Sequence, residues 1–180
     1  MATNENTFAH YAGANAGGVR SVASFQRPAN TTAYAANDVV YSSTSTAGVL
    51  LFPGVGSSGL INGAYLLIAA TLATPDLELW VFDGGTAGTE PKNALDNAAF
   101  SLNSGDLGRL VGVFEFLDTN KKLAGTFQYT EAVAKNPVAY TATGGSSAGN
   151  LYGILVTRGA FTPASSTAFV AALHVEIDKA

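Results

Sequence analysis

The segment from Gly145 to Gly149 holds a pattern that is typical of nucleophilic hydrolases. It matches G-x-S-x-G, in which Ser147 would be the nucleophile on a sharp turn between a strand and a helix. The residues that follow predict a strand and not a helix. A general base is also hard to supply, because the two histidines are His10, near the N-terminus, and His174, in a run of alternating valine and alanine. We interpret the segment as a Gly/Ser hairpin loop and predict no catalytic residue.

Three side chains that can bind metal ions occupy every second position near the C-terminus: His174, Glu176 and Asp178. In a strand they lie on one face, with roughly 7 Å between successive residues. An imidazole and two carboxylates are possible metal ligands. Three residues in line on one strand cannot surround an ion without help from elsewhere. We interpret them as the polar end of an exposed strand face and expect no metal.

Two further patterns favour turns over ligand sites. Gly84 to Thr89 is rich in glycine but lacks the lysine of a phosphate-binding loop. Asn30-Thr31-Thr32 matches a glycosylation acceptor. No secretory signal accompanies it, because Met1 to Asn6 has neither a basic nor an apolar region. We expect no cofactor, and synthesis in the cytoplasm of a host cell.

The composition argues against nucleic-acid and membrane partners. The net charge is −4, and the nine lysines and arginines are scattered, so no basic patch is expected. The most apolar stretch, Ala64 to Ala73, is far shorter than the roughly 20 residues of a membrane-spanning helix. Cysteine is absent, which removes thiolate chemistry. Charged residues make up 12%, and this neutral surface suits a protein that packs among other subunits.

Short runs with a period of two, separated by turn residues, predict an all-β chain from residue 19 onward. The clearest run is Thr167 to Asp178, in which Phe169, Leu173 and Val175 share the face expected to lie in the core. One short helix is expected over Thr89 to Leu102. Eight strands are predicted at Val19 to Phe25, Asp38 to Ser43, Gly63 to Ala73, Leu77 to Asp83, Leu107 to Leu117, Thr126 to Glu131, Leu151 to Ala160 and Thr167 to Asp178, with a weaker ninth at Val138 to Thr143.

This number of short strands predicts a two-sheet antiparallel β-sandwich with jelly-roll topology, spanning residues 19–180. Residues 1–18 are rich in Ala, Asn and Gly and predict an extended N-terminal arm. Its few apolar side chains, among them Phe8 and Tyr11, favour an arm that lies on a neighbouring subunit. The alternative is that the arm packs on its own domain.

Four more apolar residues are candidates for contacts with a partner. Phe52 and Val55 lie in a Gly-rich segment that predicts a loop, from which they could plug into a partner. Trp80 and Phe82 share a strand face opposite Leu77 and its alternate neighbours. Exposed aromatic rings are common interface anchors. The pattern leaves two possibilities open for Trp80 and Phe82: contact between subunits, or the second side of a buried sheet.

Residues 27–40, RPANTTAYAANDVV, resemble a segment common in tailed-phage structural proteins, in which R-P-x-N-T-T-x-Y-x-x-x-D-V-V opens the domain. Residues 96–102 with 110–113, and 151–156 with 159–165, are similar to the middle and the C-terminal hairpin of the same proteins. Read physically, the first string is scaffold: Pro28 ends a strand, Asn30 favours a turn, and Tyr34 offers an anchoring ring. The resemblance implies a virion structural role and no catalytic residues.

The leading hypothesis is therefore a capsid decoration or cement protein that binds the major capsid protein from outside and stabilises the lattice. Such a protein would lie on the capsid surface of the virion, and local three-fold junctions make a homotrimer plausible. The alternative is a tail or spike component with a carbohydrate-binding sandwich, which predicts a groove of exposed tryptophan, tyrosine and acidic side chains, although the chain has one tryptophan. Tyr41, Tyr65 and Tyr129 are scattered in the sequence, which shows no such groove. A hydrolase or isomerase would require clustered histidines and carboxylates.

Overall fold

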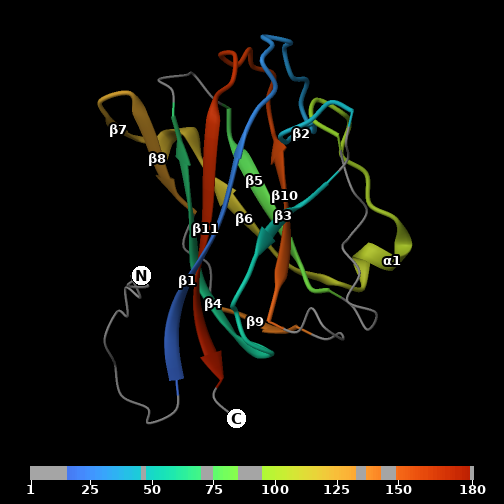
Figure 1. Ribbon diagram of the computed structural model, residues 1–180, viewed down its shortest axis with the longest axis vertical. Coiled ribbons are helices and arrows are strands. Elements are labelled where there is room, and N and C mark those ends of the chain that lie inside the picture. The colour runs from blue at the N-terminus through green and yellow to red at the C-terminus, as the bar shows by residue number, and fades with distance from the viewer. Residues whose placement is uncertain are drawn as a thin grey trace, which may run out of the picture.

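The computed structural model describes residues 16–45, 48–69, 75–84, 95–132, 137–142 and 149–178. These residues form two antiparallel sheets packed face to face (Figure 1). The predicted β-sandwich is confirmed. Phe8, Tyr11, most of the predicted arm and Ser147 lie outside the described residues.

The six-stranded sheet has the order β1-β11-β4-β8-β7, with β9 also paired to β4. The five-stranded sheet has the order β2-β10-β5-β6, with β3 also paired to β10. The strands of the first sheet are β1 (Ala16–Gln26), β4 (Ser58–Ile68), β7 (Lys122–Ala124), β8 (Phe127–Glu131), β9 (Val138–Thr141) and β11 (Ala168–Asp178). Those of the second are β2 (Val39–Val40), β3 (Leu50–Phe52), β5 (Leu77–Phe82), β6 (Leu110–Phe116) and β10 (Leu151–Thr157).

The strand pairs are nested along the chain, as in one long hairpin that has been rolled up. The first strand pairs with the last, β1 with β11, and the next strands inward, β2 and β3, pair with β10. Further inward, β4 pairs with β8 and β9, and β5 pairs with β6. This nesting is the jelly-roll topology that the sequence predicted.

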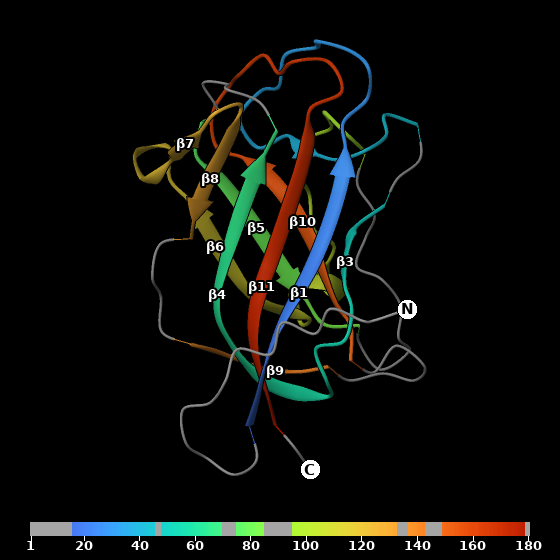
Figure 2. The same cartoon turned by 60° about the vertical axis from the view of Figure 1, so that its left-hand side comes forward.

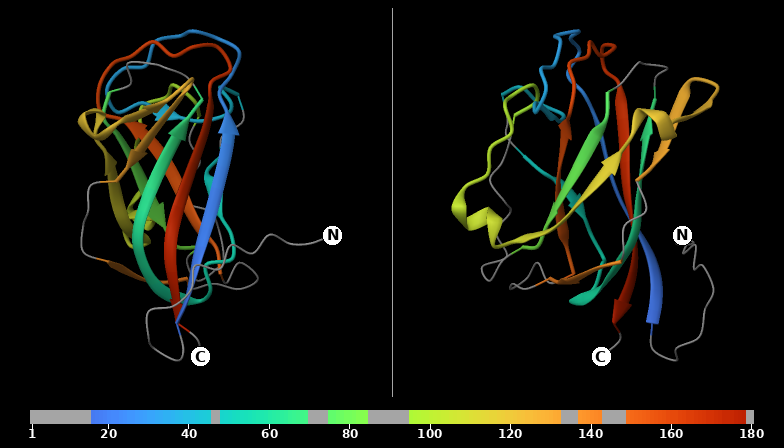
Figure 3. Two further views of the ribbon diagram at one scale, coloured as in Figure 1. Left: turned by 90° about the vertical axis from the view of Figure 1, so that its left-hand side faces the viewer. Right: turned by 180° about the vertical axis from the view of Figure 1, so that it is seen from behind.

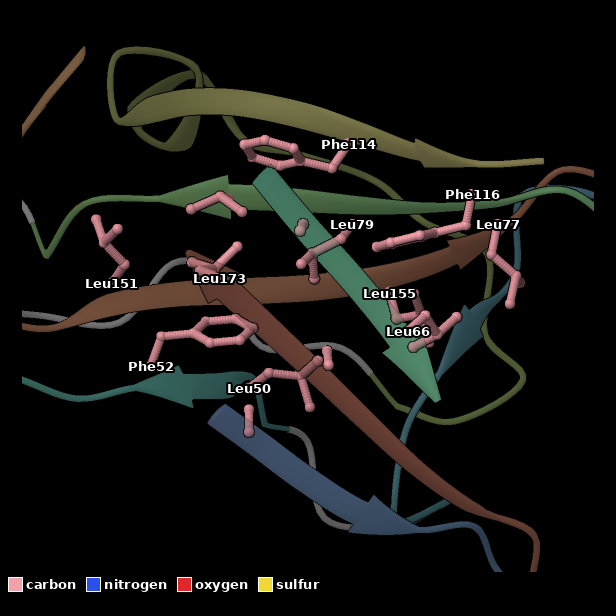
Figure 4. Close-up of a cluster of buried hydrophobic side chains, with 14 of the residues drawn as sticks. Leu50, Phe52, Leu66, Leu77, Leu79, Phe114, Phe116, Leu151, Leu155 and Leu173 are labelled. Atoms are coloured by element: carbon pink, nitrogen blue, oxygen red, sulfur yellow. The ribbon is translucent and has the colours of Figure 1, made fainter. Parts of the chain in front are cut away.

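The core lies between the sheets and is built from the inward residues of both, as Figure 4 shows for one cluster. The alternation predicted for the last strand is confirmed, because Phe169, Leu173 and Val175 are buried while His174 is exposed. Alternate residues of β5, Leu77, Leu79 and Val81, meet them from the other sheet. Apolar burial of this kind is the main stabilising term of the fold.

The predicted helix over Thr89 to Leu102 is wrong for the part that the structure describes, residues 95–102. The backbone of this segment bonds to the chain beside β2 and not to itself: Asn97 N–H donates to the Val39 carbonyl, and Phe100 N–H donates to that of Asn37. Asn97 also has a φ of 58°, which interrupts any helix. The helix that does form, α1, is a single turn at Ser104–Leu107, which Asn103 caps.

Two strands were not predicted, β3 and β7, and both have only three residues. Runs this short carry little periodicity. The third predicted strand, Gly63 to Ala73, is observed earlier in the chain, as β4 at Ser58–Ile68. The glycines and serines before Leu60 resemble a turn in the sequence, but register with β11 and β9 makes them part of the strand.

Candidate interaction surface

Arg27, Asn30 and Tyr34, in the string of residues 27–40, form a buried polar network with Asp96. Arg27 and Asp96 form an ion pair of 3.4 Å between Nη2 and Oδ2, and neither side chain is exposed. The Tyr34 hydroxyl donates to Asp96 Oδ1 at 2.6 Å and accepts a hydrogen bond from Arg27 Nε. Arg27 also donates to the side-chain and main-chain oxygens of Asn30, and Tyr41 N–H donates to Asp96.

This network joins two distant parts of the chain, because Asp96 lies 69 residues after Arg27. Every charge in it is paired and hydrogen-bonded, as burial of charge requires. Burial, reinforced by the hydrogen bond to Asp96, raises the pKa of Tyr34 well above its usual value. A phenol held in its neutral form and a carboxylate fully engaged by donors tie these two parts of the chain together.

The outer face of the five-stranded sheet is covered by the chain itself. Phe82 is fully buried there in a cluster with Val39, Ile154 and Val156. Trp80 is half-buried, with its ring centroid 5.0 Å from that of Phe100. The covering segment is residues 95–102, whose Phe100 and Leu102 pack against this cluster. Figure 3 shows this segment and α1 running along this side of the sandwich. Of the two possibilities left open for Trp80 and Phe82, the second side of a buried sheet is the one observed within the chain.

Phe52 and Val55 are core side chains of this chain and not exposed plugs. Both are 0% exposed. Val55 N–H donates to the Gly149 carbonyl at 2.7 Å, and the Val55 carbonyl accepts a hydrogen bond from Tyr140 Oη. The glycines that suggested a loop allow the chain to fold back tightly here, since Gly54 and Gly56 have φ values of 72°.

The outer face of the six-stranded sheet is different, because no other described element lies on it (Figure 2). Cross-strand register places the outward residues of four strands side by side on this face. Arg20 on β1 is opposite His174 on β11, and Tyr65 on β4 is opposite Glu131 on β8. The face also carries exposed or half-exposed apolar residues, Val22, Leu67, Phe127 and Val170 among them.

An aromatic cluster occupies the middle of this outer face. The ring of Tyr65 lies 5.5 Å from that of Tyr129 and 5.5 Å, edge to face, from that of His174. The Arg20 guanidinium lies over Tyr65, 4.9 Å from the ring centroid. Tyr129 Oη donates to Glu131 Oε1 at 2.7 Å. Burial and that hydrogen bond raise the pKa of Tyr129 to about 12, while the charge of Arg20 acts in the opposite direction.

A β-bulge interrupts the flat face beside this cluster. Val175 pairs with Ile61 and His174 pairs with Gly63, so Asn62 is the extra residue of β4. Next to the bulge is a hollow of about 320 Å³. Bulges are common where a sheet redirects side chains toward a binding site. The hollow is lined by Gly18, Val19, Arg20, Asn62, His174 and Val175.

The edge of the sandwich between β1 and β3 forms a second concave surface, which we call the open edge. β1 is an outer strand of its sheet and pairs only with β11 among the described strands. A groove of about 410 Å³ runs along it, lined mainly by apolar residues from β1 and β3. Val22 and Leu51 are 38% and 45% exposed at this edge. A long strand with one unpaired edge and apolar neighbours is a template for association.

The predicted row of His174, Glu176 and Asp178 lies on β11 as expected, at the outer face. His174 contacts Tyr65, and Glu176 accepts a hydrogen bond from Asn62 at 3.4 Å. In the part of the chain that the structure describes, no group of three or more His, Asp or Glu residues is placed to hold a metal ion. Over the same residues, no helix has the length and apolar character needed to cross a bilayer.

Sequence reasoning missed the residues that meet on the outer face. Tyr65 and Tyr129 are scattered in the chain, and only the pairing of β4 with β8 brings them into contact. Arg20 and Asn62 carried no pattern of their own. One signal was present, since each of these side chains is a polar or aromatic residue within a strand, at a position that alternates with core residues.

Comparison with known proteins adds no relative to this description. No protein-family model matches the chain, and neither a curated protein nor a solved structure matches it.

Proposed function

We propose that this chain is a structural protein of a tailed-phage virion that binds the outside of the capsid lattice and stabilises it. The observation that carries the proposal is the open edge. It combines an unpaired strand edge, an apolar groove and two exposed aliphatic side chains, Val22 and Leu51, in one place. An extended segment of a partner adds to such an edge through main-chain hydrogen bonds, while its side chains fill the groove.

The composition supports a partner that presents the same site many times. With 12% charged residues, the surface has little electrostatic repulsion to keep copies apart. Each Å² of apolar surface that is buried contributes about 25 cal/mol. A ligand that binds only the assembled lattice stabilises that lattice by mass action, even when a single contact is modest. The repeated capsid protein is the partner that meets this description.

A binding role accounts for the described residues better than catalysis does. In the described part, His174 contacts the ring of Tyr65, and no serine nucleophile is seen bonded to it. The fold itself is neutral on this point, because jelly rolls carry many functions. We propose the major capsid protein as partner, the capsid surface as location, and self-association into a homotrimer.

The aromatic cluster favours one second candidate, a tail or spike component that binds carbohydrate. Tyr65 and Tyr129 meet on an exposed face with carboxylates nearby, which is the arrangement that this alternative predicts. The place of the protein on the virion decides between the two candidates.

Cosedimentation with capsids tests the proposed function. Purified protein is mixed with capsids that have been stripped of it and, separately, with isolated tails. We expect saturable binding to capsids at a fixed copy number per capsid subunit, and none to tails. Mass measurement of the free protein in solution tests the trimer. Binding to tails alone would contradict the capsid role.

A further inference from the structure

We propose that the hollow beside the β-bulge binds a single acidic sugar residue of the uronic acid type, with its carboxylate on Arg20. This site is separate from the open edge and does not depend on the proposed capsid role. It belongs to the outer face of the six-stranded sheet, which the chain leaves uncovered (Figure 2).

The shape of the hollow follows from the bulge. The extra residue, Asn62, forms part of the rim, while Gly18 contributes no side chain to the lining. A Cβ added to Gly63, the register partner of His174, would meet no atom within 4 Å, so the space beside His174 is open. A volume of about 320 Å³ is at the small end of the range for ligand pockets, about 300–1,000 Å³.

The charged residue that lines the hollow favours an anionic ligand. The Arg20 guanidinium makes a cation–π contact with the Tyr65 ring. Within the described residues it forms no ion pair. The two neighbouring carboxylates already have neutral partners: Glu176 accepts from Asn62, and Glu131 accepts from Tyr129. Both carboxylates keep their charge, but neither lines the hollow. Among the six residues that line it, Arg20 is the one with a formal charge, and its planar fork suits a carboxylate.

The remaining groups favour a sugar over a simple acid. The His174 ring and the Asn62 amide both donate and accept hydrogen bonds, as the hydroxyls of a sugar ring require. Tyr65 fixes two of the three polar side chains, because Arg20 and His174 both pack on its ring. Beyond them, Tyr129 extends the surface along which the next residue of a glycan chain would lie.

Amide NMR titration of the full chain tests this site with matched probes. Methyl β-glucuronide, methyl α-galacturonide and the corresponding neutral methyl glycosides differ only in the carboxylate. We expect a uronide to shift the amides of β1, β4 and β11 around the hollow, with the neutral glycosides at least about tenfold weaker, the loss typical of a charge-assisted hydrogen bond.

Two variants and a control sharpen the test. Arg20→Gln should weaken the uronide by about tenfold. Arg158→Gln removes the same charge from an exposed site that follows β10, in the other sheet, and should leave affinity unchanged. Gly18→Val adds a side chain at a residue that lines the hollow and should block binding while amide dispersion shows an intact fold. Equal binding of neutral glycosides, equal binding of acetate, or no shift around the hollow would each overturn the proposal.

Discussion

The outer face of the five-stranded sheet is covered by the chain, whereas no described element covers the outer face of the six-stranded sheet. On the five-stranded sheet, residues 95–102 cover the outward side chains, so Phe82 is fully buried and Trp80 is packed on Phe100. On the six-stranded sheet, Arg20, Tyr65 and His174 lie at a face that no described element covers (Figure 2). The buried Arg27–Asp96 pair holds the covering segment in place, since it anchors residue 96 to the chain after β1.

This contrast separates stability from recognition. The covered side adds a second apolar cluster to the fold, and its polar groups find their partners inside the chain. The outer face of the six-stranded sheet, called here the bare side, buries little apolar surface. It keeps the Arg20 cation, the His174 imidazole and the Tyr65 ring within reach of another molecule. Two arginines illustrate the difference. Arg27 is buried in an ion pair with Asp96 of the covering segment, whereas Arg20 is exposed on the uncovered face, over the ring of Tyr65.

Truncating an aromatic ring on the covered face gives the largest expected effect. Phe82→Ala should lower the free energy of unfolding by about 4 kcal/mol, because it removes a fully buried ring and leaves a cavity. Val22→Ala, on the bare side, should change it by no more than about 0.5 kcal/mol. Chemical denaturation of both variants measures the difference. Equal losses would mean that the bare side is packed in solution.

A pair of glycine substitutions sharpens the comparison. A Cβ on Gly153 would lie 2.7 Å from Phe52 Cε2 and 2.9 Å from Leu79 Cδ1, in the core. Gly153→Ala should therefore cost about 2 kcal/mol through overpacking. Gly63→Ala on the bare face should be neutral or stabilising by about 0.5 kcal/mol, because alanine suits a strand better. Thermal unfolding compares them, and a destabilised Gly63→Ala would contradict the open space at Gly63.

The tyrosines differ in how they link stability to alkaline pH. Burial raises the pKa of Tyr34 in the folded chain, so above about pH 10 the unfolded chain binds fewer protons and stability falls as pH rises. Tyr34→Phe should lower stability at pH 8 and reduce that slope by about 1.4 kcal/mol per pH unit. Tyr129→Phe should leave stability at pH 8 nearly unchanged and reduce the slope by less. Urea unfolding from pH 8 to 11 measures both, and an unchanged slope in Tyr34→Phe would refute the assignment.

More of the fold than of the candidate surfaces could be predicted from the sequence. The alternation of Phe169, Leu173 and Val175 defines a strand face without any tertiary information, and it was confirmed. Val55 was misread because a glycine on each side signals a loop whether the residue between them is buried or exposed. The meeting of Tyr65 with Tyr129 depends on register, and the hollow depends on one extra residue in β4. Neither leaves a periodic trace in the sequence.

Binding of two matched leucine variants to stripped capsids tests the central claim most directly. Leu51→Asp places a charge in the groove of the open edge, and Leu107→Asp places the same charge on α1, where the leucine is also exposed. Both variants should fold, since neither side chain is part of the core. We predict that Leu51→Asp loses capsid binding in cosedimentation while Leu107→Asp binds like the unaltered chain. Equal binding of both variants would contradict docking through the open edge.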